Sequence, residues 1–276
     1  MGSDGRTGRG HKRSVTNAEK TALADPPRAP RKIGLQLYTI RAELEADPEG
    51  SLRRVKEAGF DAVEVAPPTE NLPSARLARL LRSHGLAVAA LHSELPLGDR
   101  ADAVAEMARE FDCSRLIWHG WPRDSSFDSW DGIHRLAEQY REAHAVALRL
   151  GLQFGLHNHW WEFEALAGRF PYRVILERLH PEVFLEIDTY WVRTAGLDPA
   201  AVLAELGSRV TMLHVKDGPA KQGEPMRAAG DGVMDFPAIL KTAGPSVEWL
   251  IVELDECATD IWEAIRRSRD YLRALI

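Results

Sequence analysis

The chain has 276 residues, of which 45% are hydrophobic and 28% are charged, a composition typical of a folded globular protein. It has no apolar run near the roughly 20 residues that a membrane helix needs, and its two cysteines are too few for a disulfide scaffold or a cysteine-rich zinc module. The formal charge of −6 argues against a nucleic-acid-binding protein, so we expect neither a nucleic-acid nor a membrane partner.

The first 32 residues differ from the rest in charge and pattern. They hold eight Lys or Arg and three Asp or Glu, a net charge of +5, whereas residues 33–276 hold 27 and 38, a net charge of −11. This Gly-, Arg-, Ser- and Pro-containing stretch has no apolar periodicity, which predicts a disordered basic tail over 1–32. A basic docking arm is the alternative. The stretch also lacks the apolar segment of a secretory signal, and Cys113 and Cys257 look unpaired, so we expect a cytoplasmic location.

Eight short runs with β propensity follow, and each is separated from the next by a segment long enough to hold a helix. Such long crossovers are needed between parallel neighbours. Eight strand–helix units over about 245 residues predict a single (β/α)8 TIM barrel over residues 33–276, with an open doubly wound sheet as the alternative. The expected strands are Ile33–Tyr38, Ala62–Val65, Ala87–His92, Arg115–His119, Gln153–His157, Val183–Asp188, Val210–Val215 and Trp249–Glu253.

Capping residues mark the ends of several helices between these strands. An Asp shortly before a Pro supplies an N-cap side chain and a proline in the first helical turn. A glycine after the last turn permits the left-handed conformation that redirects the chain toward the sheet. Helices are predicted to begin at Asp47–Pro48, Asp198–Pro199 and Asp235–Pro237, and to end at Gly59, Gly85 and Gly151.

Polar side chains gather where the predicted strands end, which is the face of such a barrel where active sites lie. Asp188, His214 and Glu253 end three strands at an equivalent height. Burying these groups unpaired is unfavourable, and a divalent cation such as Mn²⁺, Co²⁺, Mg²⁺ or Zn²⁺ is the physical means of holding them together. We therefore expect them to bind a metal, whereas Glu94, Glu186 and Asp255 are expected to be ion-pair or surface groups.

Imidazole and indole side chains are concentrated at the same strand ends. His92 and His119 are expected either to line a pocket or to bind metal. The tryptophans suit the apolar faces of a sugar ring, although they could simply cover the barrel mouth. Five of the eight tryptophans fall in these segments: Trp118, Trp121, Trp160, Trp161 and Trp191.

Five ordered segments resemble the sugar phosphate isomerase/epimerase family with the xylose isomerase-like TIM barrel. The most specific is His157-Asn158-His159-Trp160-Trp161-Glu162-Phe163, which is similar to the subgroup with a His-Asn-His-x-x-Glu-Phe motif. The others are Leu185–Asp188, Leu213–Asp217, Gly230–Phe236 and Val252–Glu256. The resemblance covers about residues 33–275. It implies the family and its barrel, but fold and family alone do not define one reaction.

The resemblance implies one divalent metal with Asp188, His214 and Glu253 as ligands. Many relatives take a fourth ligand from a Glu three residues before the motif Asn, where this chain has Gly155. Glu162 is our first choice for that ligand, with His157 or His159 next; an exposed loop carboxylate is the alternative role for Glu162. The catalytic candidates are Glu162, Glu253, His157, His159 and Lys216, and the substrate-binding candidates are His92, His119, Trp118, Trp160, Trp191 and Arg227.

The implied chemistry is removal of a proton from carbon next to a carbonyl, with the metal stabilising the enediolate that forms. Return of the proton gives isomerisation or epimerisation of a sugar, and loss of a β-substituent gives elimination on a 3-keto-glycoside by a lyase or hydratase. We expect an unphosphorylated sugar and a possible homo-oligomer.

Two rival classes remain. One is a sugar-binding or partner subunit without catalysis, motivated by the missing strand-five Glu. The other is an abasic-site endonuclease, for which Trp191 stands where a metal ligand would be needed.

Overall fold

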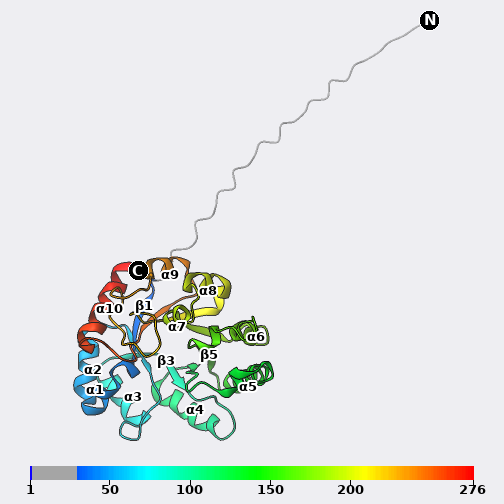
Figure 1. The fold of residues 1–276 in the computed structure, drawn as a ribbon. Helices are drawn as coiled ribbons and strands as arrows, with labels where there is room; N and C mark the ends of the chain where they lie inside the picture. The colour runs from blue at the N-terminus through cyan, green and yellow to red at the C-terminus, as the bar shows by residue number, and fades with distance from the viewer. Residues whose placement is uncertain (2–29) are drawn as a thin grey trace.

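Eight parallel strands close into a barrel in the computed structural model, which describes Met1 and residues 30–276 (Figure 1). Each strand pairs with its neighbours in chain order, and β1 pairs with β8 to complete the ring. The predicted (β/α)8 barrel is therefore confirmed. The strands are β1 Lys32–Gln36, β2 Ala62–Val65, β3 Ala87–Ser93, β4 Arg115–Trp118, β5 Gln153–His157, β6 Phe184–Asp188, β7 Val210–Val215 and β8 Trp249–Val252.

Helices surround the barrel and connect successive strands (Figure 1). The α-helices are α1 Arg41–Ala46, α2 Pro48–Glu57, α3 Ser74–Ser83, α4 Arg100–Phe111, α5 Trp130–Arg149, α6 Pro171–Leu176, α7 Thr189–Thr194, α8 Pro199–Leu206, α9 Phe236–Thr242 and α10 Ile261–Leu275. Short 3₁₀ segments are η1 Leu37–Ile40, η2 Ser125–Asp128, η3 Trp161–Phe163 and η4 Gly207–Arg209. Within the described part of the chain, no helix is long and apolar enough to cross a membrane.

The predicted helix ends are confirmed by the hydrogen bonds that form them. Asp47, Asp198 and Asp235 accept backbone N–H groups at the starts of α2, α8 and α9. The glycines predicted to end helices all have positive φ, namely 81° at Gly59, 63° at Gly85 and 75° at Gly151.

The barrel begins slightly earlier than the sequence indicates. Lys32 is the first residue of β1 and pairs with Trp249. The guanidinium of Arg31 is buried and donates to the backbone carbonyls of Leu240 and Ala243 at 3.1 and 2.6 Å. Residues 30–32 thus lie against the barrel, and the rest of the predicted tail, apart from Met1, lies outside the described residues. Cys113 and Cys257 are both free thiols.

Two apolar cores hold the fold together. The larger one lies between the strands and the surrounding helices, and a smaller one fills the lower part of the barrel interior with Ala62, Ala89, Ala90, Ile117, Phe184, Met212, Trp249 and Ile251. The upper part of the interior is polar instead. The polar side chains of the interior therefore lie at the carboxyl ends of the strands, which is where active sites lie in such barrels.

Two register shifts occur in the sheet, and each lies beside a buried glutamate. One lies between Val63 and Glu64 in the pairing of β2 with β3, and the other between Leu185 and Glu186 in the pairing of β6 with β7. Such irregularities re-aim side chains relative to the neighbouring strand. Both glutamates are fully buried.

Candidate metal centre and substrate pocket

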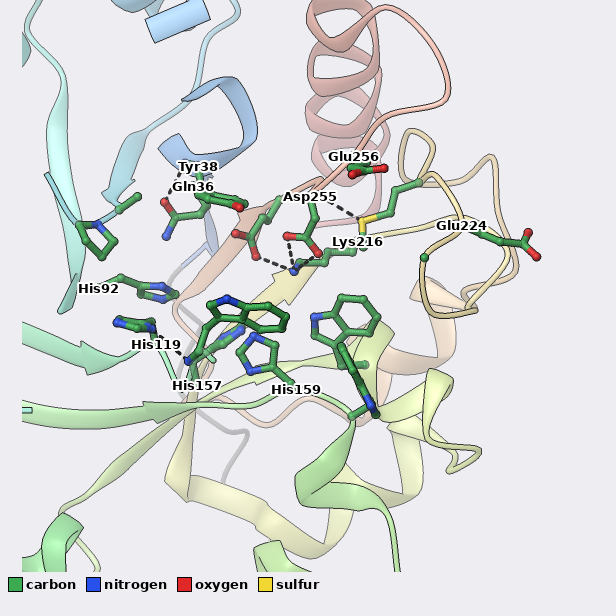
Figure 2. A pocket seen from close by; sticks show the side chains of 18 residues that line it. Gln36, Tyr38, His92, His119, His157, His159, Lys216, Glu224, Asp255 and Glu256 are labelled. Atoms are coloured by element: carbon green, nitrogen blue, oxygen red, sulfur yellow. Dashed lines mark hydrogen bonds and ion pairs between the residues drawn. The ribbon is translucent and has the colours of Figure 1, made fainter. Parts of the chain in front are cut away.

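A pocket of about 380 Å³ opens at the carboxyl ends of the strands (Figure 2). Its aromatic lining comes from Tyr38, Trp121, Trp160 and Trp191, and its imidazoles are His92, His119, His157 and His159. Its charged lining consists of one lysine and four acids, namely Lys216, Glu224, Glu253, Asp255 and Glu256. The combination of flat apolar walls with a polar floor suits a small polyhydroxylated molecule.

Four buried side chains at the floor of the pocket form an upper ligand group, made of His157, Asp188, His214 and Glu253. Each offers one donor atom, and these four atoms lie within 4.8 Å of one another. The group brings together three of the four predicted metal ligands, all except Glu162. Asp188 and His214 are neighbours in the pairing of β6 with β7, and Glu253 directly follows β8.

The ammonium group of Lys216 lies among the carboxylates of this upper group. Its Nζ is 3.1 Å from Asp188 Oδ2 and 2.8 Å from Glu253 Oε2. It is also 3.0 Å from Asp255 Oδ2 (Figure 2). Burial alone lowers the pKa of Lys216, but these carboxylates together raise it well above its usual range. Lys216 is therefore a permanent cation at the edge of the pocket.

A lower ligand group lies next to the upper one and shares His157 and His214 with it. Its other members are His92 and Glu186, and all four donor atoms again lie within 4.8 Å of one another. Glu186 stands two residues before Asp188 on β6, so both side chains face the barrel interior, and Glu186 lies one layer deeper.

Glu64 completes the surroundings of the lower group. Its Oε2 is 2.7 Å from His214 Nε2 and 3.2 Å from His92 Nε2, and it accepts a hydrogen bond of 2.7 Å from Gln36 Nε2. Burial, followed by the charge of Glu186, raises the pKa of Glu64 to about 7. Burial likewise raises the pKa of Asp188, to about 6.

The imidazoles divide into two electrostatic classes. Burial lowers the pKa values of His92, His157 and His159, so these rings are neutral and can offer a nitrogen lone pair. Burial also acts to lower the pKa of His214, but the carboxylates of Glu186, Glu253 and Glu64 raise it well above its usual range. His214 therefore differs from the other three rings in the direction of its pKa shift.

The donor set fits a divalent cation, judged by its unpartnered oxygens. Three carboxylate oxygens of the site, Glu64 Oε1, Glu186 Oε1 and Asp188 Oδ2, are buried and have no hydrogen-bond partner among the described residues. A buried carboxylate oxygen without a partner is costly. A metal ion supplies the missing positive charge, and neutral imidazoles with carboxylates form a ligand set that first-row divalent metals accept.

Glu162 is not brought into either group, although it was our first choice for the fourth ligand. It is buried rather than exposed, and its Oε2 accepts the backbone N–H of His159 at 3.0 Å. It lines a separate small cavity with Tyr140 and Phe163, where burial raises its pKa to about 8. The residue from β5 that does join both groups is His157.

Position 155, where the family resemblance implies a carboxylate in many relatives, is closed to a side chain in this barrel. A Cβ added at Gly155 would lie 2.4 Å from Cε2 of Phe184. The aromatic ring of Phe184 therefore occupies the space on the β5 side of the barrel floor.

The predicted substrate-binding residues divide into two sets. His92, His119, Trp160 and Trp191 line the pocket, as does the catalytic candidate His159. Trp118 instead lines the small cavity beside Glu162, and Arg227 is exposed outside the pocket, with its backbone N–H bonded to the carbonyl of Asp217.

Sequence reasoning missed Gln36 and did not place Glu186 in the site. Glu186 was expected to be an ion-pair or surface group. It is fully buried and forms ion pairs with imidazoles, as the first of these alternatives predicts, and Glu64 joins it there. The signal was available in the pattern of the strands. A glutamate in the middle of a short apolar strand, as in Ala-Val-Glu-Val and Phe-Leu-Glu-Ile-Asp, must face the interior together with its partners.

A closed parallel barrel with His, Asp and Glu side chains converging under a pocket at its carboxyl end defines a TIM-barrel protein with a candidate metal centre. Residues 52–275 match the family described as the xylose isomerase-like TIM barrel. The chain belongs to this family, as the sequence resemblance implied.

Comparison with solved structures gives the same fold. A sugar phosphate isomerase/epimerase from Parabacteroides distasonis is 22% identical, with a TM-score of 0.74 over 88% of this chain and 98% of that chain. A second such protein from the same organism is 24% identical, with a TM-score of 0.72 over 92% and 97%. The apo form of 3-keto-D-glucoside 4-epimerase from E. coli is 19% identical, with a TM-score of 0.64 over 89% and 100%. No curated protein matches the chain.

Proposed function

We propose that the chain is a divalent-metal-dependent isomerase or epimerase of a sugar or keto-sugar, which acts by removing a proton next to a carbonyl. The observation that carries this proposal is the position of two overlapping ligand groups at the floor of an aromatic-walled pocket. The names of the similar solved structures, which include a sugar phosphate isomerase/epimerase and a keto-glucoside epimerase, support the same reaction class.

A divalent ion held by members of the two groups would act as a Lewis acid toward the oxygens of a bound keto-sugar. His157 and His214 belong to both groups, so they are ligands whichever group holds the ion. The aromatic side chains of Trp160 and Trp191 would hold a sugar ring over this floor. Proton transfer then depends on groups that line the pocket.

Glu253 is the strongest candidate for the base. Burial alone would raise its pKa, but Lys216 and His214 lower it well below its usual range, so it is ionised at neutral pH. It lines the pocket, whereas Glu162 does not. His159 is neutral and lines the pocket as well, which makes it the second candidate for moving a proton. Lys216, 2.8 Å from Glu253, can donate to an oxygen that gains negative charge.

The pocket lining favours an unphosphorylated substrate. Four acidic side chains and one lysine line it, so a phosphate group would meet net negative charge. The same lining opposes the phosphates of DNA, which disfavours the abasic-site endonuclease. Elimination on a 3-keto-glycoside uses the same first step and remains the alternative reaction.

Hydrogen exchange tests the proposal directly. Purified protein, stripped with EDTA and reloaded with Mn²⁺, Co²⁺, Zn²⁺ or Mg²⁺, is incubated in D₂O with ketoses and with a 3-keto-glucoside, and loss of the α-proton signal is followed by ¹H NMR. We expect exchange that needs the metal and is abolished in Glu253→Gln. If binding of a sugar is measurable but no compound exchanges with any ion, the non-catalytic sugar-binding role replaces the enzyme.

A further inference from the structure

We infer that the metal ion binds to the lower group, His92, His157, Glu186 and His214 with Glu64 beside it, and that Lys216 provides the cation of the upper group. The inference rests on the proposed function. It names the residues that hold the metal and leaves the proposed reaction unchanged. It differs from the ligand set that the family resemblance implies, which contains Asp188 and Glu253. The contacts of the two groups decide between these positions.

The upper group already has a cation within its own chain. Asp188 Oδ2 and Glu253 Oε2 lie 3.1 and 2.8 Å from Lys216 Nζ. The other carboxylate oxygen of Asp188 accepts the backbone N–H groups of Tyr190 and Trp191, both at 3.0 Å, and so caps α7. Oδ1 of Asp188 thus accepts two hydrogen bonds, and Oδ2, which has no hydrogen-bond partner among the described residues, is in ion-pair contact with Lys216. An ion bound here would have to displace this buried ammonium group.

The carboxylates of the lower group have no lysine or arginine partner among the described residues. Among the described residues, the ion-pair partners of Glu64 and Glu186 are imidazoles only. Glu186 Oε2 lies 2.8 Å from His92 Nε2, 3.1 Å from His214 Nε2 and 3.3 Å from His157 Nδ1. Three ring nitrogens therefore converge on one carboxylate, and the second oxygens of Glu64 and Glu186 have no hydrogen-bond partner. A metal ion at this point would supply positive charge to both carboxylates.

The neighbouring residues support His214 as a ligand through Nε2. Glu253 Oε2 lies 2.7 Å from His214 Nδ1 and can accept its proton, which leaves Nε2 free to bind an ion on the side of Glu186. A carboxylate on the far nitrogen is the usual support of a metal-binding histidine. Glu253 then acts on the metal through His214, and it keeps its own place on the pocket wall for proton transfer.

The two register shifts place the carboxylates of this group. They lie beside Glu64 and Glu186, on β2 and β6, which are on different sides of the barrel. Below the group, the interior is apolar and contains Phe184 and Met212. His92 and His157 line the pocket above it. The lower group is therefore closed from below and meets the pocket through two imidazoles.

The donor chemistry also predicts which ions bind. Three imidazole nitrogens with one or two carboxylates favour Zn²⁺, Co²⁺, Fe²⁺ or Ni²⁺, whereas Mg²⁺ prefers sites made of oxygen. We expect the protein to select these ions over Mg²⁺ by a large factor when the ions compete. A site formed by Asp188, Glu253 and one histidine would discriminate less.

Two isosteric variants on one strand test the inference. Glu186→Gln and Asp188→Asn each remove one carboxylate charge from β6, and an Asn at 188 can still cap α7. Metal-free protein is titrated with Co²⁺ and followed by the visible absorption of bound Co²⁺, and bound metal is counted by elemental mass spectrometry. Far-UV circular dichroism controls for folding, and His92→Gln replaces Glu186→Gln if the latter does not fold.

We expect Glu186→Gln to weaken Co²⁺ binding by at least about 10–100-fold and to change the spectrum, whereas Asp188→Asn binds as the wild type does. Loss of binding in Asp188→Asn, retention in Glu186→Gln, or no binding in the wild type would overturn the inference. The test measures no turnover. Co²⁺ bound at the lower group without α-proton exchange would refute the proposed reaction alone, and exchange that depends on an ion lost in Asp188→Asn would refute the inference alone.

Discussion

Replacing Lys216 with Met tests whether its ammonium group neutralises the acids at the pocket edge. Met keeps most of the length and apolar volume of the lysine side chain and removes only the charge. In the wild type, Nζ contacts Asp188, Glu253 and Asp255 within 3.1 Å, and Lys216 is almost completely buried. The variant leaves these carboxylates without their shared cation.

The magnitude follows from the burial of the partners. Asp188 is fully buried and Glu253 nearly so, whereas the side chain of Asp255 is 31% exposed and is screened by water. Removing one partner of a buried ion pair costs about 3–5 kcal/mol of unfolding free energy. We expect a loss in this range at pH 8, with Asp188 and Glu253 accounting for most of it.

The loss should depend on pH with a defined sign. Asp188 has a pKa of about 6 despite Lys216, which acts to lower it, so the pKa of Asp188 rises further in Lys216→Met. When folding raises the pKa of a carboxyl group, the folded protein loses stability as the pH rises from the pKa of the unfolded state to that of the folded state. The deficit of the variant is therefore smaller at pH 5, where Asp188 is protonated, than at pH 8.

Urea unfolding of metal-free protein, followed by circular dichroism at pH 5 and pH 8, measures both effects. Lys221→Met is the matched control, because Lys221 is exposed and its pair with Glu224 at 3.4 Å lies on the surface. The control should lose less than about 1 kcal/mol at either pH. Equal stability of Lys216→Met and the wild type at pH 8, or a deficit that does not change with pH, would refute the reasoning.

Three further predictions concern the floor, the small cavity and the ion. Gly155→Ala should destabilise the protein by about 1–3 kcal/mol in urea unfolding, because the new Cβ meets Phe184 at 2.4 Å; a neutral result would mean that the ring moves freely. Glu162 has a pKa raised to about 8, so wild-type stability should fall between pH 4.5 and 8 by up to about 1.4 kcal/mol per pH unit from this group. Glu162→Gln should remove that slope, and an unchanged slope contradicts the assignment. Saturation with Co²⁺ at about 100 times its Kd should stabilise the protein by about 2.7 kcal/mol, seen as a higher Tm that EDTA reverses; an unchanged Tm argues against a bound ion.

The sequence predicts those site residues whose positions follow from the strands that carry them. Asp188, His214 and Glu253 end neighbouring strands, and the structure brings their donor atoms together as expected. The choice of Glu162 as the fourth member was based on proximity in the motif. The chain turns after His157 so that Glu162 accepts the N–H of His159 and points to a different cavity. His157 and Glu162, which belong to one short motif, therefore lie in two separate sites.

The sequence by itself determined the strands, the helix caps and the end of the barrel that carries polar side chains, because apolar periodicity and capping act over a few residues. Only the tertiary structure decided which polar groups meet. Glu64 and Glu186 reach the same point from strands more than 100 residues apart, through register shifts that no local pattern reports. The ring of Phe184 fills the space at Gly155. Lys216 reaches Asp188 and Glu253 because it follows β7, which pairs with β6 on one side and β8 on the other. Contacts of this kind depend on the stagger of strands around the barrel, which is a property of the whole sheet.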